Sequence, residues 1–195
     1  MSHHVYHTRG IILGSVPMRE SNRFYKILTD ELGLIGASAQ SVRDGKSKLR
    51  YALQDFSPVV VDLVRGKEMW RITSAIEEFA CPNIKSDSVR LKLFARLCSL
   101  VQRLVHGEGR EDALLLDLRG AFEFLEEDVL PSELHSAFET LATFRVLVLL
   151  GYFDYEGYEE FMESGIWSTE TLEKFEKLRL KVIPRINEAL VASQL

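Results

Sequence analysis

Residues 5–42 read VYHTRGIILGSVPMRESNRFYKILTDELGLIGASAQSV, and this stretch decides the fold of the N-terminal part of the chain. Its β-branched and aromatic residues form short runs that polar turn-forming residues separate, a pattern typical of β-strands. Two similar runs follow before residue 80. Five short strands predict a small closed barrel, because closure leaves no strand edge exposed. The strands are expected at Val5–Ser15, Arg23–Thr29, Leu34–Val42, Phe56–Arg65 and Met69–Glu78.

The pattern becomes helical after Pro82, which we expect to lie in a hinge because proline disfavours helical geometry in the residue before it. Apolar residues then recur at a spacing of three to four. The sequence therefore predicts an α+β protein with a five-stranded barrel domain over residues 1–80 and an all-α domain over residues 81–195. The helical segments are expected at 88–106 after the N-cap Asp87, at 111–128, at 133–150 after the N-cap Ser132, and from Ser168 or Thr169 onward, with a kink or restart at Pro184.

The composition is that of a folded, soluble protein. Of the 195 residues, 46% are hydrophobic and 27% are charged, which is enough apolar material for one large or two small cores. Cys81 and Cys98 show no metal-ligand spacing, so neither a disulfide framework nor a cysteine zinc site is expected. The chain has no run long enough to span a membrane and no signal-peptide pattern at its start. These features lead us to expect a cytoplasmic protein.

The charges are distributed unevenly. Residues 1–80 carry 11 Lys and Arg against 9 Asp and Glu, whereas residues 81–195 carry 13 against 20, and the net charge of the chain is -5. A surface for nucleic acid therefore belongs in the N-terminal part, where it must be a local patch.

The most informative segment is S41-V-R-D-G-K-S-K-L-R50, which contains four cationic residues and a single acidic residue, Asp44. Such clusters bind phosphate backbones because each neutralised phosphate releases condensed counterions. Charged loops are often merely solvated, and aromatic residues in a small barrel are often core, so this pattern alone leaves nucleic-acid binding open. The candidate contacts are Arg43, Lys46, Lys48 and Arg50, extended by Arg19, Arg23 and Lys26, with Tyr25, Phe56 or Trp70 as surfaces for base stacking.

Several motifs occur in an order that resembles the RecO recombination mediator family. They are T8-R-G-I-I-L13, R23-F-Y-K-I-L-T29, E31-L-G33, the basic loop leading into L53-Q-D-F56, R65-G66, and F144-R-V-L-V-L-L-G-Y152. The resemblance implies an N-terminal OB-fold barrel followed by a helical domain. It also implies a non-catalytic protein that binds single- and double-stranded DNA, anneals complementary strands and helps to load the recombinase RecA. The implied partners are RecR and the acidic tail of single-strand binding protein, and the implied DNA contacts are the four cations of the loop with Arg23 beside them.

One departure from the family concerns zinc. Many members follow the equivalent of G151-Y152 with paired cysteines that bind zinc, whereas residues 151–165 contain no cysteine. We therefore expect no structural zinc and no other cofactor. The region should instead be held by aromatic packing of Tyr152, Phe153, Tyr155, Tyr158, Phe161 and Trp167.

The tail of single-strand binding protein would need an apolar pocket rimmed by Lys or Arg, because its terminal carboxylate and its aromatic end must be bound together. Arg103, Arg119 and Arg145 lie beside apolar stripes and are candidates, although each could form an ordinary ion pair on a helix surface instead. His135 and Glu139 make a poor metal site, and the carboxylates between Asp154 and Glu163 lack the order of a calcium loop.

No nucleotide-binding, hydrolase or metalloprotease motif is present in the sequence, so we expect a binding protein and not an enzyme. Two alternatives to a DNA-binding mediator stay open. One is a protein-interaction adaptor that does not touch DNA, because the helical half is acidic. The other is an RNA-binding OB-fold protein, because the same barrel and loop would suit single-stranded RNA.

Overall fold

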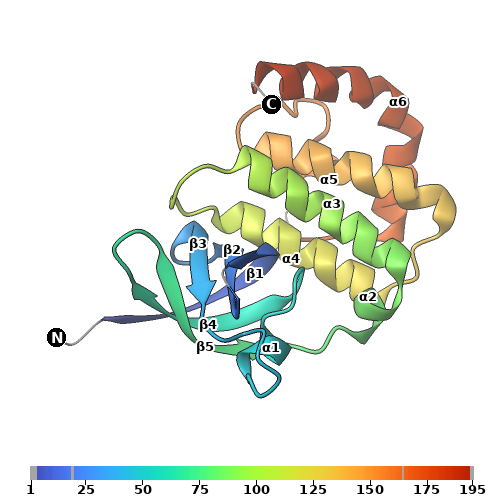
Figure 1. Ribbon diagram of the computed structural model, residues 1–195. Coiled ribbons are helices and arrows are strands. Elements are labelled where there is room, and N and C mark those ends of the chain that lie inside the picture. Colours follow the sequence, from blue (N-terminus) through green and yellow to red (C-terminus); the bar gives the residue numbers. More distant parts are fainter. Residues whose placement is uncertain (1–3, 19, 164, 194–195) are drawn as a thin grey trace. The chain divides into compact units, whose positions relative to one another are not determined.

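The computed structural model describes residues 4–18, 20–163 and 165–193. Its contacts divide the chain into two compact units: residues 1–81 with 106–115, and residues 82–105 with 116–195. The first unit is a β-barrel and the second is helical (Figure 1). Within the described ranges, no helix is both long and apolar enough to cross a membrane.

The barrel unit contains the five predicted strands, in the closed order β1-β2-β3-β5-β4 of an OB-type barrel. The largest differences from the predicted ends are that β1 continues past Ser15 and that β3 stops before Val42, because Ser41 adopts a left-handed backbone conformation with φ 54°. The observed strands are β1 (Val5–Met18), β2 (Asn22–Thr29), β3 (Gly33–Ala39), β4 (Pro58–Arg65) and β5 (Trp70–Glu77).

Closure of the barrel depends on β1 and on one short parallel pairing. The N-terminal half of β1 pairs with β4 and its C-terminal half pairs with β2, with a register shift between Ile12 and Gly14. Such a bulge bends a strand, which allows one strand to belong to both sides of the barrel. The last gap closes where β3 runs parallel to β5, with Ala37 opposite Trp70 and Ser38 opposite Arg71. The interior is filled by side chains that include Ile12, Ile27, Ile35, Val61 and Leu63.

Residues 106–115 also belong to the barrel unit. Gly33 has φ 64°, and a Cβ atom at this position would lie 2.0 Å from the carbonyl oxygen of Gly109, so glycine permits the close approach of this segment. Glu108 accepts hydrogen bonds from Arg65 at 2.6 Å and from the Trp70 indole N–H at 3.1 Å. The Arg65 hydrogen bond is the main reason that the pKa of Glu108 lies below its usual value.

The helical unit contains the predicted helical segments, together with short turns between them. Asp87 caps α3 by accepting from the backbone N–H groups of Val89 and Arg90, and Ser168 caps α6 by accepting from Thr171. The predicted cap at Ser132 is wrong, because Ser132 lies inside a 3-10 turn and makes no capping hydrogen bond. The elements are α2 (Pro82–Ser86), α3 (Ser88–Leu104), α4 (Asp112–Glu127), η1 (Ser132–Leu134), α5 (His135–Leu149), η2 (Glu159–Phe161) and α6 (Thr169–Ala192), which continues through Pro184.

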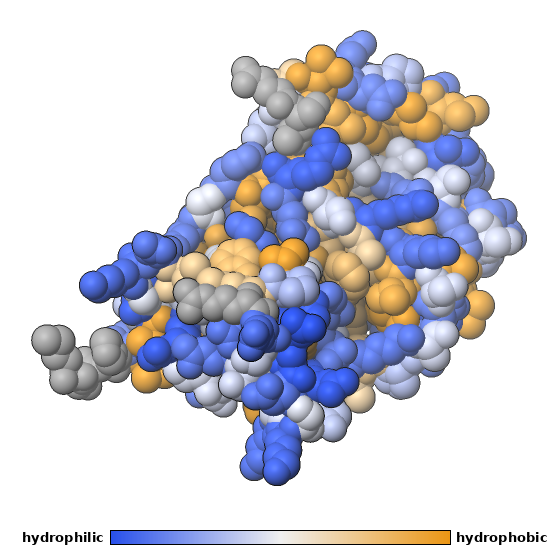
Figure 2. Space-filling model, viewed as in Figure 1, coloured by the Kyte–Doolittle hydropathy of each residue, from blue (hydrophilic) through white to orange (hydrophobic). Residues whose placement is uncertain are grey.

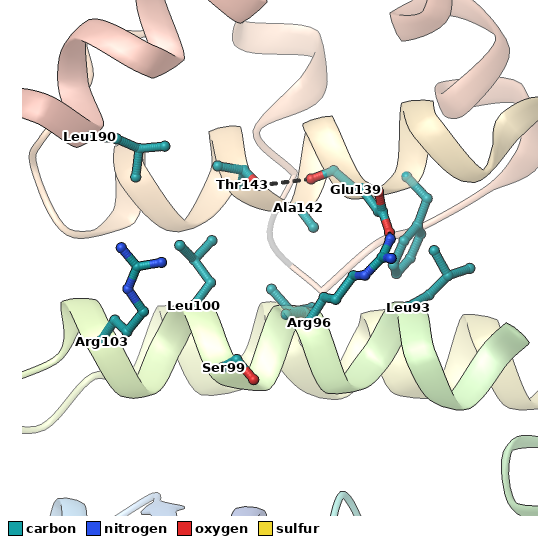
Figure 3. Close-up of a pocket in the computed structure, with 11 residues that line it drawn as sticks. Leu93, Arg96, Ser99, Leu100, Arg103, Glu139, Ala142, Thr143 and Leu190 are labelled. Atoms are coloured by element: carbon teal, nitrogen blue, oxygen red, sulfur yellow. Dashed lines mark hydrogen bonds and ion pairs between the residues drawn. The ribbon is translucent and has the colours of Figure 1, made fainter. Parts of the chain in front are cut away.

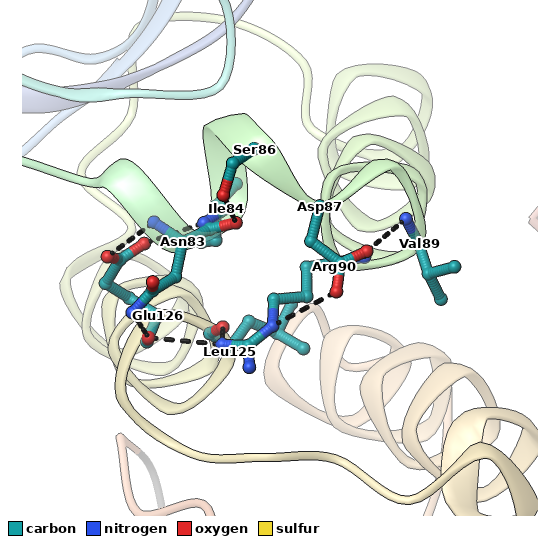
Figure 4. Close-up of polar contacts among 8 residues, drawn as sticks. All are labelled: Asn83, Ile84, Ser86, Asp87, Val89, Arg90, Leu125 and Glu126. Carbon is teal, nitrogen blue, oxygen red and sulfur yellow. Dashed lines mark hydrogen bonds and ion pairs between the residues drawn. The ribbon is translucent and has the colours of Figure 1, made fainter.

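The predicted change from strands to helices at Pro82 coincides with the division between the two units, which falls between Cys81 and Pro82, and the hinge itself stays a prediction. Pro82 begins α2, and the next two backbone N–H groups, of Asn83 and Ile84, donate to the Glu126 carboxylate at 3.0 and 2.9 Å. Arg90 donates to the carbonyl of Leu125 at 2.6 Å, so the start of α2 and the start of α3 are both fastened to the end of α4 (Figure 4). Helix α5 is buried on more than one side and lies between α3 and α6 (Figure 1).

Candidate nucleic-acid interface

The cationic loop, residues 41–50, is anchored by apolar residues and presents its charges to solvent. Val42 and Leu53 belong to the barrel core, and Leu49 packs against it. The segment ends in a one-turn helix, α1 (Leu49–Ala52), which the sequence did not predict. Hydrophilic residues gather at the projecting tip of the barrel below α1 (Figure 2). The four cations predicted to contact DNA, Arg43, Lys46, Lys48 and Arg50, are all exposed.

Backbone hydrogen bonds fix both ends of this region. The Ser41 N–H donates to the Asn22 side chain at 3.1 Å, and the Phe56 N–H donates to the Ile12 carbonyl at 2.9 Å. Ser41 and Phe56 both have left-handed backbone conformations, which cost non-glycine residues about 1–2 kcal/mol each. Because the surrounding structure maintains these conformations, the backbone at both ends of this region is held in place before any ligand binds.

Three of the basic residues surround a pocket of about 330 Å³, which we call the arginine pocket. Its polar lining consists of Arg23, Tyr25, Arg43, Arg50 and Asp55, together with Gln54. Arg23 is held by hydrogen bonds from Nε and Nη2 to the Ser15 hydroxyl, at 3.0 and 2.7 Å, and lies 3.7 Å from the Asp55 carboxylate. The structure therefore brings Arg23 together with two cations of the loop, as the sequence predicted.

Lys26 does not share this pocket. Successive residues of a strand point to opposite faces, so Lys26 lies on the face of β2 opposite to Arg23 and Tyr25. It is exposed beside Phe24, with Nζ 5.9 Å from the ring centroid, and the Phe24 ring lies over Gly36, where a Cβ atom would be 2.5 Å from it.

This outer face of β2 and β3 is the one on which OB barrels bind oligonucleotides. The strand register continues it from Phe24 through Ser38 to Arg71, an exposed cation on β5. Arg71 was not among the predicted contacts, because its place on this face depends on the parallel pairing of β3 with β5. The barrel thus has two cationic surfaces: the loop with its arginine pocket, and the outer face with Lys26 and Arg71.

Two of the three predicted stacking residues are wrong. Tyr25 is fully buried, and Trp70 is 4% exposed, covered by Arg65 at 4.7 Å and bonded to Glu108. Phe56 is half-buried. The exposed aromatic residue of the region is Tyr51, 72% exposed on α1 next to Arg50. Leu49 and Leu53 pack inward, so Tyr51 between them points outward. The spacing of these two leucines in the sequence could have predicted this exposure.

In the helical unit, α3, α5 and Leu190 of α6 form a pocket of about 380 Å³, which we call the helical groove. Its floor is apolar and includes Leu97, Leu100 and Phe138. Arg96 and Arg103 extend from α3 towards α5 on either side of Leu100 (Figure 3). Arg96 pairs with Glu139, whereas Arg103 forms no ion pair with any residue that the structure describes.

Of the other predicted positions, Arg19 lies outside the described residues, and Arg119 is half-buried on α4. Arg145 is buried, with 1% of its side chain exposed, so its assignment to a partner-binding surface is wrong. It pairs with Asp117 at 2.9 Å and donates to the carbonyls of Phe161 and Ile166 at 2.7 and 3.0 Å. Burial raises the pKa of Asp117, and the Arg145 guanidinium acts against that shift.

The described residues contain no group of three His, Cys, Asp or Glu side chains that could hold a metal ion. Glu139 is engaged by Arg96, and the carboxylates of Asp154, Glu156, Glu159, Glu160 and Glu163 lie on an exposed acidic surface. Of the aromatic residues expected to pack in this region, Phe153, Phe161 and Trp167 are buried, whereas Tyr152 and Tyr155 are exposed.

The barrel and the helical unit place the chain among proteins that join an OB-type barrel to a helical domain. Residues 1–79 match the family model "Recombination protein O N terminal". The barrel unit is therefore similar to the N-terminal domain of the RecO family over residues 1–79.

Curated relatives show the same similarity. The chain is 34% identical over 124 residues to the DNA repair protein RecO of Dehalococcoides mccartyi, covering 63% of this chain and 49% of the relative. It is 31% identical over 150 residues to that of Heliobacterium modesticaldum, covering 76% and 52%. The chain therefore spans about half the length of the relatives it matches. Among solved structures, asparaginyl-tRNA synthetase from Pyrococcus horikoshii matches 66% of this chain and 33% of that chain, with 18% identity and a TM-score of 0.26, which supports no inference.

Replacing Arg145 by methionine tests the structural role of this residue. We expect Arg145→Met to lower the free energy of unfolding by roughly 3–5 kcal/mol, because it leaves the buried Asp117 carboxylate and two carbonyls without their partner. Urea unfolding followed by helical circular dichroism measures the change. Arg179→Met, which breaks a more exposed ion pair with Glu176 on α6, is the control and should cost less than about 1 kcal/mol. Equal losses in the two variants would contradict this role.

Proposed function

We propose that this chain is a cytoplasmic DNA-binding recombination mediator, which binds single- and double-stranded DNA and acts by binding instead of by catalysis. The observation that carries the proposal is the cationic loop of the OB-type barrel. Its residues 43–50 contain four exposed cations, and backbone hydrogen bonds fix both ends of the region. Similarity of residues 1–79 to the RecO family, and of the chain to curated RecO relatives, supports the same function.

The charge of the barrel unit makes this loop the principal source of DNA affinity. The segment 106–115 contributes Arg110 against three carboxylates, which cancels the small cationic surplus of the strands and loops. A neutral unit has no general attraction for DNA, so binding must come from local clusters. Complementary strands repel each other through their phosphates, and a protein that neutralises both backbones promotes their annealing.

The helical groove supports a second part of the proposal, in which the unit binds the acidic tail of single-strand binding protein. The apolar floor suits the aromatic end of the tail, and Arg103 at the rim suits its terminal carboxylate. RecR is a further proposed partner, supported by similarity to the RecO family alone, as is the loading of RecA.

The first test is the salt dependence of DNA binding, measured by fluorescence anisotropy with a labelled single strand. About four phosphate contacts should give a slope of log affinity against log salt near -3, at roughly -0.7 per phosphate. Changing Arg43, Lys46, Lys48 and Arg50 together to alanine should flatten this slope and weaken binding at low salt.

The matched control removes the same charge from exposed lysines of the helical unit, by changing Lys92, Lys174, Lys177 and Lys181 to alanine. This control should keep the slope of the wild type. Failure of the wild type to bind DNA at low salt would favour the adaptor alternative, and tighter binding to RNA of the same sequence would favour the RNA-binding alternative. The DNA site would lie on the outer face if the slope of log affinity against log salt persists in the loop variant but flattens in the double variant Lys26→Ala/Arg71→Ala.

A second test concerns base stacking on Tyr51. We expect Tyr51→Ala to weaken single-strand binding about tenfold, because stacking of one base on an aromatic side chain contributes about 1–3 kcal/mol. Binding of a duplex of the same sequence should change little, since its bases are already stacked. Tyr155→Ala, at an exposed tyrosine of the helical unit, is the control. Equal effects on the single strand and the duplex would show that Tyr51 does not stack on bases.

A third test addresses the helical groove. A labelled acidic peptide ending in an aromatic residue with a free carboxylate should bind the full chain, and Arg103→Ala should weaken this binding about tenfold, as expected for loss of a charge-assisted hydrogen bond. Lys181→Ala, on α6 outside the groove, should leave the affinity unchanged. If a peptide amidated at its C-terminus binds as tightly as the free acid, the groove does not recognise the carboxylate.

A further inference from the structure

The hydroxyl of Tyr25 is buried and has no hydrogen-bond partner among the residues that the structure describes. Most buried polar atoms in folded proteins are paired, and an unpaired one costs about 1–3 kcal/mol. Phenylalanine would fill the same space in the barrel core without this cost. The tyrosine hydroxyl therefore points to a partner that is not part of the protein.

Tyr25 is part of the lining of the arginine pocket. It shares the inward face of β2 with Arg23, and the loop adds Arg43 and Arg50. Burial raises the pKa of Tyr25 to about 12, an effect that Arg23 partly opposes. The hydroxyl is therefore protonated at neutral pH and is available as a hydrogen-bond donor.

The pocket has the charge and the donors that a phosphate group requires. Its three guanidinium groups face one carboxylate, Asp55, which leaves a formal charge of +2. Arg23 is held by Ser15, and Arg43 donates to the carbonyl of Glu20 at 3.0 Å, so both side chains are positioned while part of each guanidinium stays available. Each guanidinium carries five N–H donors in a planar fork that matches phosphate oxygens.

We propose that the arginine pocket binds one phosphate group of a nucleic-acid strand, and that the Tyr25 hydroxyl donates a hydrogen bond to one of its oxygens. The proposal rests on the proposed function, which brings a strand to the adjacent loop. Because the hydroxyl is itself buried, the phosphate reaches it when a neighbouring side chain moves. Asp55 is the residue that an incoming anion would displace, since its side chain is 36% exposed and carries negative charge.

The phosphate has two possible sources, an internal phosphodiester with one negative charge or the monoester at a strand end with nearly two. The charge of the pocket matches the monoester better. Oligonucleotides of one sequence, with and without a terminal phosphate, separate the two sources.

The test compares the wild type with Tyr25→Phe, which keeps the ring and every charge. Calorimetric titration with inorganic phosphate should show binding by the wild type and about tenfold weaker binding by Tyr25→Phe, as expected for loss of one hydrogen bond to a charged group. Thermal unfolding of Tyr25→Phe should be equal to or higher than that of the wild type, because an unpaired buried hydroxyl is removed. Tyr155→Phe, in the helical unit, is the matched control and should behave as the wild type.

Binding of the oligonucleotides completes the test. A gain in affinity from a terminal phosphate that Tyr25→Phe abolishes assigns the pocket to a strand end, and an equal loss with both oligonucleotides assigns it to an internal phosphate. The proposal is overturned if inorganic phosphate does not bind, or if Tyr25→Phe binds phosphate and both oligonucleotides as the wild type does. In that second case, the salt dependence of DNA binding and its loss in the loop variant would be unaffected. The proposed function would then hold although the proposal for the pocket fails. Phosphate binding without any DNA binding would overturn the assignment to nucleic acid.

Discussion

Closure of the five-stranded barrel is the constraint on which the candidate interface depends. The interior is filled by apolar side chains, and the Tyr25 ring belongs to this core. Arg23 lies near the start of β2, on the same inward face as Tyr25. The cationic loop is fastened beside them because Val42 and Leu53 complete the same core. The pocket is therefore a consequence of closure: the core positions the loop, and the loop adds two arginines to the residues of β2.

The helical unit depends on a different interaction, the buried pair of Arg145 and Asp117. Arg145 connects α5 to α4 through Asp117 and to residues 161–166 through two backbone carbonyls, and its guanidinium lies 4.5 Å from the Trp167 ring. The family resemblance implied zinc-binding cysteines close to this part of the chain, and the sequence suggested that aromatic packing replaces them. Aromatic packing is only part of what holds this region. A buried cation with three hydrogen-bonded partners supplies directional contacts that aromatic side chains cannot provide.

The sequence predicted elements better than it predicted exposure. Strand alternation and helical spacing located all five strands and the four main helices, because these patterns report which side of an element is buried. The same patterns could not reveal that Arg145 is buried, since an arginine beside an apolar stripe has the same spacing whether it faces solvent or a carboxylate on another helix. Tyr25 and Trp70 were mistaken for exposed stacking residues for a related reason, and the pairing of β3 with β5 that places Arg71 joins residues far apart in the sequence.

Glu108 gives the segment 106–115 an electrostatic role in addition to its packing against the barrel. Its carboxylate neutralises Arg65 and accepts from Trp70, so one cation and one aromatic ring of the β4–β5 hairpin are already occupied within the protein. In OB barrels this hairpin commonly contributes to oligonucleotide binding. Here Arg65 is satisfied internally, whereas Lys67 and Arg71 of the hairpin remain exposed, as do the four cations of the loop. The loop therefore keeps the denser group of exposed cations, which makes it the stronger candidate for contact with DNA.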